Sequence, residues 1–594
     1  MVRIAVRGRS ETCSGEGYAS LGACSMSPVA RTRAVAVLLA LPFLAAGPAW
    51  AQPAEGSGVA VTQPAATFAV TGRGWGHGVG MSQWGAYGFA RQGSTYDRIL
   101  AHYYAGTALA RAPVSHVRVL LVRGRQTLTI GSSLPFRVRD GAGALHDVDS
   151  GVHRLGPLLR LPVRTRANPK PNPRPKPKGK PKPQPPAPKL RNLPGPLVVS
   201  AGGAPLELNG KRYRGALELE AFGKRLRAIN VVGLEAYLYG VVPDEMPHDW
   251  LPEALRAQAV VARSYALAVR RGGDFDLFAD VRSQVYGGME AEEHEATAAV
   301  EATRGQVLTY GGRVATTFFF STSGGRTASV TDVWPGSRPT PYLVSVQDPY
   351  DAISPHHSWG PLQYTSRRLA RELGVKGRLL DVRTVVNASG RVERVVGVGV
   401  EGEGAVLASE LRRRLELRST YFRVGVLSLH PPGQQVPYGT TLQLAGIARD
   451  LPNVMLQQRA ASSLWQTAAV LRPAADGTFV ASVEPLALTE YRLASGSIAS
   501  APVHATVTPV ISLALAEPNL LRGRVRPALT GATVIVQRLA GPIWRDVVGA
   551  SIDPRGGFET RAQLQPGGSY RARLAVPARG LAPGVSPTLT VAAP

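Results

Sequence analysis

Cysteine is almost absent from this chain: its 594 residues include two, Cys13 and Cys24. Both lie upstream of residue 52, where we expect the exported form to begin. The rest of the chain therefore has neither disulfides nor thiolate metal sites, and burial of apolar side chains must stabilise it. Its length is ample for such cores and predicts about three or four domains.

A long apolar run is also lacking at the N-terminus. The run Ala34–Ala46 follows two arginines and is too short to span a bilayer comfortably, and an Ala-Trp-Ala sequence ends at Ala51. These features together predict a secretory signal peptide, so we interpret residues 1–51 as the signal-peptide region, with the start at Met26. An uncleaved membrane anchor is the alternative. We expect an exported protein of the periplasm, cell wall or cell surface.

Acidic residues are outnumbered: 41 Asp and Glu face 68 Lys and Arg, which gives a net charge of +27. An exported protein with this charge meets anionic polymers such as wall glycans with acidic peptides, teichoic acids, lipopolysaccharide or shed DNA. Such charge favours nonspecific attraction and solubility but indicates neither a fold nor a reaction. Nucleic acid is the generic partner of a basic protein, but the signal peptide argues against it, so we expect none.

Composition divides the remainder into segments. Residues 52–66 are rich in Ala, Gly and Pro, which predicts a disordered linker. Residues 67–428 mix strand and helix patterns, which predicts an α+β domain with mixed β-sheets, a few helices and a groove. Within it, residues 166–191 alternate Pro with Lys or Arg and predict a disordered, extended insertion. Such a tether suits nonspecific contact with anionic polymers, although a solvated spacer is the simpler interpretation.

The C-terminal part shows short alternating strands with Gly and Pro turns and an internal repeat. The stretch that leads to Trp465 echoes the stretch that leads to Trp544. This spacing predicts two all-β sandwich-like domains, 429–508 and 509–594. Such modules bind, space or stiffen, and nothing in these two suggests catalysis.

Glu245 is the acid with the most informative surroundings. It lies between Pro243 and Pro247, just before a segment that predicts a helix over 252–271. A carboxylic acid fixed on a Pro-bounded turn at a helix entrance, beside polar side chains, can act as a general acid or base. The same position suits an ordinary first-turn acid that interacts with the helix dipole. The residues alone leave both interpretations open.

Several motifs together resemble the SpoIID/LytB family of cell-wall proteins, over residues 72 to about 425. The stretches that carry the resemblance are Val231–Val242, Glu253–Tyr265, Ser283–Gly288, Ser321–Thr327 and Leu417–Phe422. Enzymatic members of the family cleave peptidoglycan glycan strands as lytic transglycosylases. The LytB branch resembles an amidase-enhancing wall-binding protein.

One further family signature, Gly72–Ala86, stands in an unusual place. In the better-known members it follows the Leu417–Phe422 motif at the C-terminal end, whereas here it opens the domain. The simplest account is a circular permutation, which is tolerated when chain ends lie close together at the surface. We therefore expect His77 to lie near Glu245 in space.

The resemblance implies an exported lytic transglycosylase with Glu245 as its single catalytic acid/base. Glu245 would cleave the bond between N-acetylmuramic acid and N-acetylglucosamine and leave an anhydro-muramic end. Apolar neighbours such as Met246 and Trp250 must then raise its pKa. The alternative is a non-enzymatic wall-binding protein that enhances an amidase. The expected partners are peptidoglycan glycan strands and, on the alternative, a wall amidase.

The resemblance also implies substrate-binding candidates: Arg263, Arg256, Gln258, Ser264, Tyr265, Gln284, Tyr286, His77, Gln83 and Ser323. Arg263 suits a carboxylate of the substrate or the orientation of Glu245. Gln284 and Tyr286 suit hydrogen bonding and stacking on sugars, and Ser323 lies in a loop expected to offer backbone N–H groups. Each also has a structural interpretation, as a surface charge or a satisfied buried group. We expect no cofactor and no metal, because the zinc-binding cysteines of some members have no counterpart here.

Overall fold

The structure is a computed structural model that describes residues 66–165, 187–460, 463–576, 578 and 580–592. These residues fall in one compact unit, Thr62–Pro594. The expected signal-peptide region, residues 52–65 of the expected linker and most of the Pro-rich insertion lie outside the described residues. Within the described part, no helix has the length and apolar character needed to cross a membrane.

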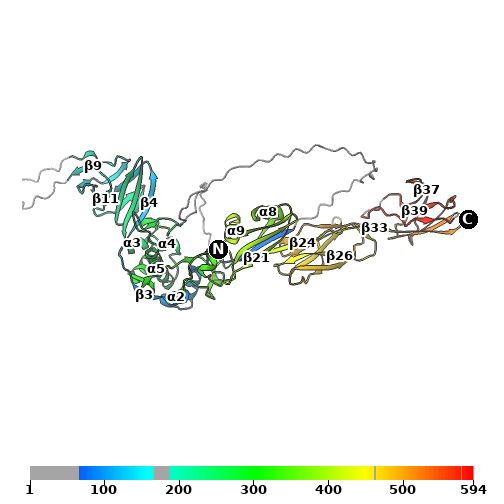
Figure 1. Cartoon of the computed structure of the whole chain (residues 1–594), viewed down its shortest axis with the longest axis horizontal. Helices are drawn as coiled ribbons and strands as arrows, with labels where there is room; N and C mark the ends of the chain where they lie inside the picture. The colour runs from blue at the N-terminus through cyan, green and yellow to red at the C-terminus, as the bar shows by residue number, and fades with distance from the viewer. Residues whose placement is uncertain (1–65, 166–186, 461–462, 577, 579, 593–594) are drawn as a thin grey trace, which may run out of the picture. The chain divides into compact units, whose positions relative to one another are not determined.

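A helical group surrounds one central helix, α5 (Pro252–Ala268), whose small and apolar residues are largely buried. It packs most extensively against α1 (Gln83–Arg91), α2 (Tyr96–Tyr103), α6 (His294–Ala302) and β17 (Gln306–Tyr310). Figure 1 shows α2 beside α5 although a long stretch of chain separates them. The remaining elements here are α3 (Leu234–Tyr239), α4 (Val242–Glu245), η1 (Gly288–Ala291), β2 (Met81–Ser82), β3 (Ala108–Arg111), β18 (Arg313–Val314), β19 (Phe319–Phe320), α7 (Val330–Val333) and η2 (Asp351–Ile353).

Two sheets share one core with these helices through their buried apolar residues. The strands of the larger sheet, in spatial order, are β10 (Lys189–Asn192), β9 (Arg160–Thr165), β7 (Leu145–Val148), β6 (Phe136–Arg139), β11 (Leu197–Ser200), β14 (Ala216–Phe222), β15 (Arg225–Gly233), β4 (His116–Arg125) and β16 (Leu277–Phe278). Those of the smaller are β13 (Lys211–Tyr213), β12 (Leu206–Leu208), β5 (Leu128–Ser132) and β8 (Gly151–Leu155). A two-residue turn, Asn209-Gly210, joins β12 to β13, with φ of 51° and 79° as such a hairpin requires.

The end of the Pro-rich insertion differs from the expectation. Residues 189–192 form β10, which pairs antiparallel with β9. The sequence there, Lys-Leu-Arg-Asn, contains no Pro, so every residue can donate to the sheet. The expected tether of 166–191 was therefore wrong at its C-terminal end, and residues 166–186 lie outside the described part.

A further region of strands and helices has its own core. Its strands are β1 (Thr67–Arg73), β20 (Ser358–Thr365), β24 (Phe422–Leu429), β21 (Leu379–Val386), β22 (Val392–Gly399) and β23 (Gly402–Leu407), and its helices are α8 (Ser366–Leu373) and α9 (Ala408–Leu415). The strand β1 pairs with both β20 and β24. The first described strand therefore lies beside a strand that begins some 350 residues later in the chain.

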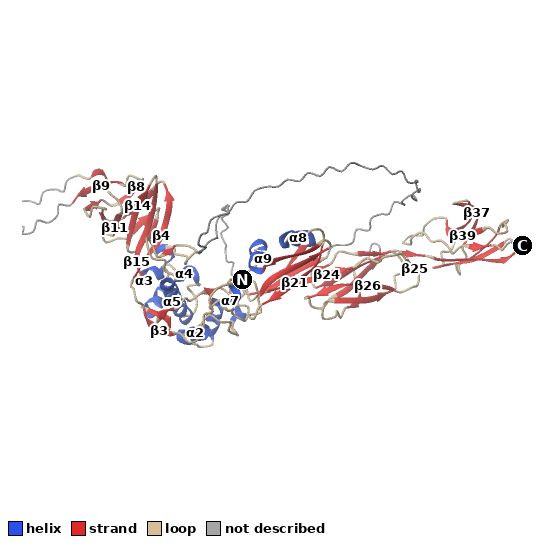
Figure 2. Ribbon diagram, in the orientation of Figure 1, coloured by secondary structure: helices blue, strands red, loops and turns tan. Residues whose placement is uncertain are grey.

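The C-terminal strands form two successive pairs of sheets, each pair around a small apolar core, in agreement with two all-β modules (Figure 2). The first comprises β26 (Leu442–Arg449), β29 (Thr478–Val483), β28 (Gln466–Val470), β27 (Met455–Ala460), β30 (Thr489–Ser495), β31 (Ile498–Ala499), β32 (Val503–Ala505), β25 (Val436–Pro437) and β33 (Val507–Thr508). The second comprises β34 (Val510–Glu517), β35 (Leu520–Arg526), β38 (Gly557–Arg561), β37 (Ile543–Ser551), β36 (Thr533–Ala540), β39 (Ser569–Leu574) and β40 (Leu589–Thr590).

The boundary expected at residues 428 and 429 does not separate two sheets. The strand β24 pairs with β1 on one side and with β26 on the other, so one sheet continues across it. The reason is that β24 alternates side chains into two cores: Val426 lies in one, and Leu427 and Leu429 lie in the next.

Candidate functional site

Glu245 is the last residue of the one-turn helix α4. Pro243 stands in the first turn of α4, and the chain becomes extended at Met246, the residue before Pro247. The next helix, α5, starts only at Pro252 and carries Glu253 in its first turn. Glu253, and not Glu245, is therefore the acid in the first turn of α5. Its carboxylate accepts the backbone N–H of Tyr96 at 2.7 Å.

The Glu245 carboxyl group is half-buried and has one hydrogen-bond donor. Its Oε1 accepts from the Val285 N–H at 3.3 Å, so the Ser283–Gly288 segment lies against it. The pKa of Glu245 is raised to about 7: burial is the largest cause, the Val285 hydrogen bond opposes it, and the charge of Asp244 adds a smaller rise. At neutral pH the group is therefore present in both its protonated and its ionised form.

Gln83 ties the Gly-rich segment to Glu245. Its Nε2 donates to the backbone carbonyl of Glu245 at 2.8 Å, and its side chain is buried. This contact holds the backbone of Glu245, and substrate binding by Gln83 stays a prediction. The Gly72–Ala86 segment and Glu245 thus lie together despite their separation in sequence.

Three half-buried aromatic rings belong to the two segments that the Gln83 contact joins. Trp250 stacks on Tyr87 with 4.5 Å between ring centroids and meets Trp84 edge-on at 4.7 Å. Trp84 and Tyr87 come from α1, directly after Gln83. Sequence reasoning did not single out these two rings, although both lie in or next to the Gly-rich signature. Aromatic faces of this kind can stack on sugars.

His77 lies in an aromatic cluster rather than at the carboxyl group. Its ring contacts Phe320 at 5.4 Å, Trp334 at 5.3 Å and Phe318 at 6.0 Å. Its Nδ1 accepts from the Val79 N–H at 3.1 Å. Burial, with the nearby charge of Arg391, lowers the pKa of His77 to about 4, so its ring is neutral at pH 7.

Contacts connect His77 to Glu245 through two other rings. Phe318, which touches His77, also meets Tyr265 at 5.8 Å between centroids. The pKa of Tyr265 is raised by burial first and then by the charge of Glu245. His77 therefore belongs to the same neighbourhood as Glu245, but a direct part in stabilising charge does not fit a neutral ring with Nδ1 already bonded.

Arg263 is a structural residue and not the substrate ligand that we expected. It is fully buried and binds Glu235 of α3 through Nε at 3.2 Å and Nη2 at 2.6 Å. Its remaining N–H groups donate to the carbonyls of Gln306, Val300 and Ala259. Every donor of the guanidinium is thus occupied within the protein, so none remains for a sugar or a lactyl carboxylate.

Two more candidates have satisfied hydroxyl groups in the core. Ser264 donates to the Val260 carbonyl at 2.7 Å and accepts the Leu308 N–H at 2.8 Å. Tyr286 donates to Asn230 at 2.9 Å. Both hydroxyl groups are thus bonded within the protein, which fits the interpretation of these residues as satisfied buried groups.

The backbone N–H groups of the Ser323 loop are also occupied. A fully buried carboxylate, Asp351, accepts from the N–H groups of Ser323 at 2.8 Å and Gly324 at 2.9 Å, and the Ser323 hydroxyl accepts the Gly325 N–H. The expected role in substrate binding was wrong for this loop, because Asp351 already fills the cradle of N–H groups. Sequence reasoning missed Asp351, which no local motif marks.

Of the remaining candidates, Tyr265 fits the site best. It is half-buried, and the charge of Glu245 adds to the effect of burial in raising its pKa. Its hydroxyl has no hydrogen-bond partner among the described residues. Arg256 pairs with Glu253 on the outside of α5. Gln284 accepts from Tyr237 at 3.2 Å, while its Nε2 has no described partner.

Gln258 is fully buried in α5, and neither end of its amide has a partner among the described residues. Replacing it by the similarly shaped Met removes an unsatisfied polar group, so we expect Gln258→Met to raise the free energy of unfolding by about 1–2 kcal/mol. Urea denaturation measures this. A loss of glycan affinity at unchanged stability would instead support the substrate-binding role that the sequence suggested.

One group of side chains could hold a metal ion. The ligand atoms of His248, Glu293 and Glu295 lie within 4.8 Å of one another, and all three residues are exposed. Exposed acidic groups often gather without a metal, and the expectation of no metal stays a prediction.

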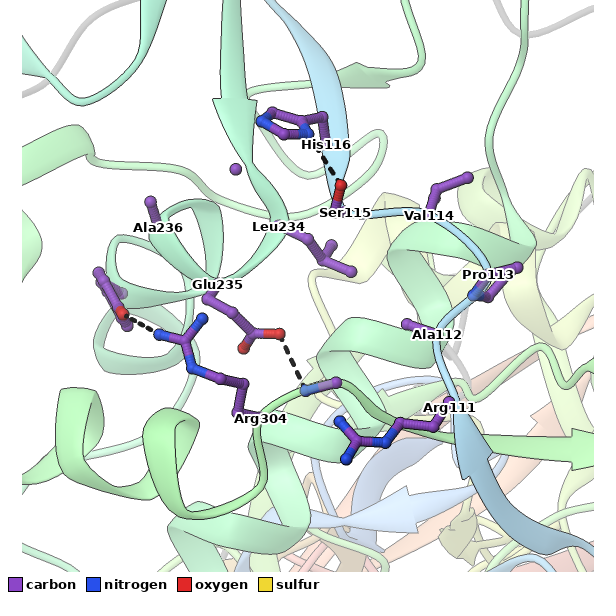
Figure 3. A pocket seen from close by; sticks show the side chains of 13 residues that line it. Arg111, Ala112, Pro113, Val114, Ser115, His116, Leu234, Glu235, Ala236 and Arg304 are labelled. Atoms are coloured by element: carbon purple, nitrogen blue, oxygen red, sulfur yellow. Dashed lines mark hydrogen bonds between the residues drawn. The ribbon is translucent and has the colours of Figure 1, made fainter.

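A pocket of about 540 Å³ lies elsewhere on the helical group (Figure 3). Its lining includes Arg111, Arg304 and Glu235, and the Glu235 carboxylate accepts the Gly305 N–H at 3.0 Å. Glu235 pairs with Arg263, which is two residues and so about 200° around α5 from Tyr265. This pocket and Glu245 therefore lie on different sides of α5.

Comparison with known proteins points to one family. Residues 223–310 match the SpoIID family, described as "Stage II sporulation protein". This range includes Glu245, Tyr265 and Val285, which the structure brings together.

Individual relatives agree with that match. The chain is 33% identical over 168 residues to stage II sporulation protein D of Bacillus subtilis, which covers 25% of this chain and 48% of that protein. It is 40% identical over 114 residues to the amidase enhancer of the same organism, covering 19% and 15%. An uncharacterized protein of Brachyspira hyodysenteriae is 37% identical over 143 residues, covering 23% and 38%. The chain thus spans half or less of the length of each.

Proposed function

Because this chain belongs to the SpoIID/LytB family, we propose that it acts on peptidoglycan outside the cytoplasm and cleaves its glycan strands as a lytic transglycosylase. The observation that carries this proposal is Glu245: its carboxyl group has a pKa of about 7, accepts the Val285 N–H, and its charge raises the pKa of Tyr265. A carboxyl group that can both give and take a proton at neutral pH is what a single-acid mechanism needs.

The proposed reaction uses Glu245 twice. The protonated carboxyl gives its proton to the glycosidic oxygen as the bond from that oxygen to the anomeric carbon of the muramic residue breaks. The carboxylate then takes the proton of the C6 hydroxyl as that oxygen bonds to the anomeric carbon. The anhydro ring forms without water, so no second carboxylate is required, unlike in ordinary glycosidases.

The neighbours of Glu245 have separate parts in this proposal. The Val285 N–H stabilises the carboxylate that remains after the first proton transfer. Gln83 holds the backbone of Glu245 in place, and the Trp84, Tyr87 and Trp250 rings offer faces for sugar residues. Tyr265 is positioned to donate a hydrogen bond to the substrate or to Glu245.

We also propose that the domain is circularly permuted relative to better-known family members. The Gly-rich segment begins where the Leu417–Phe422 motif lies: the Arg73 N–H donates to the Tyr421 carbonyl at 2.8 Å, and the Gly76 N–H to that of Arg418 at 3.0 Å. A segment that followed residue 422 directly could thus occupy the same place. These contacts support the permutation, because they join the two stretches that would be consecutive in the other order.

The amidase-enhancer relative supports a second candidate function, in which the chain binds glycan and recruits a wall amidase without cutting. The two functions are separated by incubating purified protein with insoluble peptide-free glycan strands. An enzyme releases soluble fragments with time, whereas a binding protein sediments with the strands and releases none.

The pKa of Glu245 sets an expected pH profile. The first step needs the protonated form, which predominates below about pH 7, so the cleavage rate should fall as pH rises through this value. Above it we expect a decline of about tenfold per pH unit. Initial rates of fragment release from pH 5 to 9 measure this. A rate that rises steadily through pH 8 would contradict the assignment of Glu245 as the acid.

A further inference from the structure

The first sandwich module carries a distinctive group of three side chains on its outer face. Gln457 of β27 lies directly across from Arg492 of β30, and Arg492 Nε donates to Gln457 Oε1 at 2.9 Å. The Arg492 guanidinium lies 4.2 Å from the centroid of the Trp465 ring. Along β30 the neighbours Tyr491 and Leu493 are buried, so Arg492 points away from the core.

The second module repeats this group in the same register. Gln537 of β36 lies across from Arg571 of β39, and Arg571 Nε donates to Gln537 Oε1 at 2.9 Å. The Arg571 guanidinium lies 4.2 Å from the centroid of the Trp544 ring. Here too the flanking residues of Arg571 are buried. We call each set a Gln–Arg–Trp cluster.

Each cluster fixes its guanidinium but leaves the outer edge open. The Nη atoms of Arg492 and Arg571 make no hydrogen bond to another described residue, and neither Arg pairs with a described carboxylate. The nearby carboxylates bind other groups. Glu490 pairs with Arg459, which also lies over the Trp465 ring at 4.5 Å. Asp546 pairs with Arg573 at 3.0 Å and accepts from the Gln537 amide at 2.7 Å.

A guanidinium held in this way is prepared for an oxyanion. Stacking on the Trp and the bond to the Gln amide fix the plane of the fork, so little conformational freedom is lost when a ligand binds. The two free Nη groups match the paired oxygens of a phosphate or a carboxylate. Burial lowers the pKa of Arg492, and the neighbouring charge of Arg459 lowers it further. A bound anion would stabilise the charged guanidinium and so oppose both effects.

We propose that the two Gln–Arg–Trp clusters each bind an oxyanion group, phosphate or carboxylate, of a repeating anionic polymer of the cell wall. Two equivalent sites on one chain bind a repeating ligand with avidity that one site lacks. The assignment of the wall as the source rests on the proposed function, whereas the oxyanion chemistry does not. Retention on the polymer is independent of cleavage by Glu245.

The test compares binding of full-length protein to inorganic polyphosphate and to poly-glutamate at about 0.15 M salt. We expect Arg492→Gln or Arg571→Gln alone to weaken binding by at least about tenfold, and the double variant by about a hundredfold. The matched control is Arg472→Gln with Arg524→Gln, which removes two exposed arginines of the same modules, and it should stay within about threefold of wild type. Thermal denaturation verifies that every variant is folded.

Two results would overturn the proposal: equal loss in the control pair, which would mean a net-charge effect, or unchanged binding in the double variant. Arg492→Lys with Arg571→Lys keeps the charge but removes the fork, so its binding should remain weak, and full recovery would also refute the role of the fork. Walls with phosphate polymers removed, and walls with amidated peptide carboxylates, identify the source by which treatment releases the wild type. Glycan cleavage, measured in parallel, should be unchanged in the double variant, so failure here and failure of the proposed enzyme are distinguishable.

Discussion

Replacing Glu245 by Gln should lower the rate of glycan cleavage by about 10²–10⁴-fold, the contribution typical of a general acid or base. The amide has nearly the same shape, so it can keep the Val285 N–H contact but cannot transfer the proton. Release of soluble fragments from labelled peptide-free strands measures the effect, and sedimentation with the strands should be retained.

Asp244→Asn is the matched control for this substitution. It removes one negative charge from the preceding residue, so any effect of charge alone on substrate binding is shared by the two variants. Because the Asp244 charge raises the pKa of Glu245, the control should shift the pH profile toward lower pH while the maximal rate stays within a few fold. If Asp244→Asn lost as much activity as Glu245→Gln, Glu245 would have no special role.

Arg263→Met should be the most damaging substitution for stability, lowering the free energy of unfolding by about 3–5 kcal/mol. It leaves Glu235 as an uncompensated carboxylate whose partner was a fully buried guanidinium. Adding Glu235→Gln should recover part of the loss, because the unpaired charge is then gone. Urea denaturation of the single and double variants measures both effects.

One result would contradict the structural role of Arg263. If Arg263→Met unfolded like wild type but bound glycan much more weakly, its role would be in substrate recognition and not in the core. The Arg256→Met variant, on the outside of the same helix, should change stability by less than about 1 kcal/mol.

The local sequence predicted the elements around Glu245 well. Helix α5 begins at the expected residue, Pro252, and ends at Ala268, three residues before the expected end, because its apolar spacing depends on short-range geometry. The motifs also indicated that the Gly-rich segment and Glu245 are neighbours, which the Gln83 contact bears out.

The faces of α5 could not be predicted from its sequence. Arg263, Ser264 and Tyr265 are consecutive, yet the first pairs with α3, the second binds β17, and the third lies toward Glu245. Which side each occupies depends on segments far away in the chain. The same is true of Asp351, which satisfies the Ser323 loop, and of β24, whose pairing with β26 erased an expected boundary.

The repeat in the C-terminal modules predicted their fold class but not their side-chain contacts. The echo between the stretches around Trp465 and Trp544 predicted two similar β modules. It did not predict that an Arg from a later strand stacks on each Trp, because that contact depends on the pairing of β27 with β30 and of β36 with β39.

In the proposed reaction, Glu245 cleaves glycan as the muramic C6 oxygen closes on the anomeric carbon. The most direct measurement is mass spectrometry of products formed from peptide-free glycan strands in ¹⁸O-labelled water. We expect fragments that end in anhydro-muramic residues, carry no ¹⁸O and disappear with Glu245→Gln. Fragments with ¹⁸O-labelled reducing ends, or no fragments at all from a folded protein that binds the strands, would contradict it.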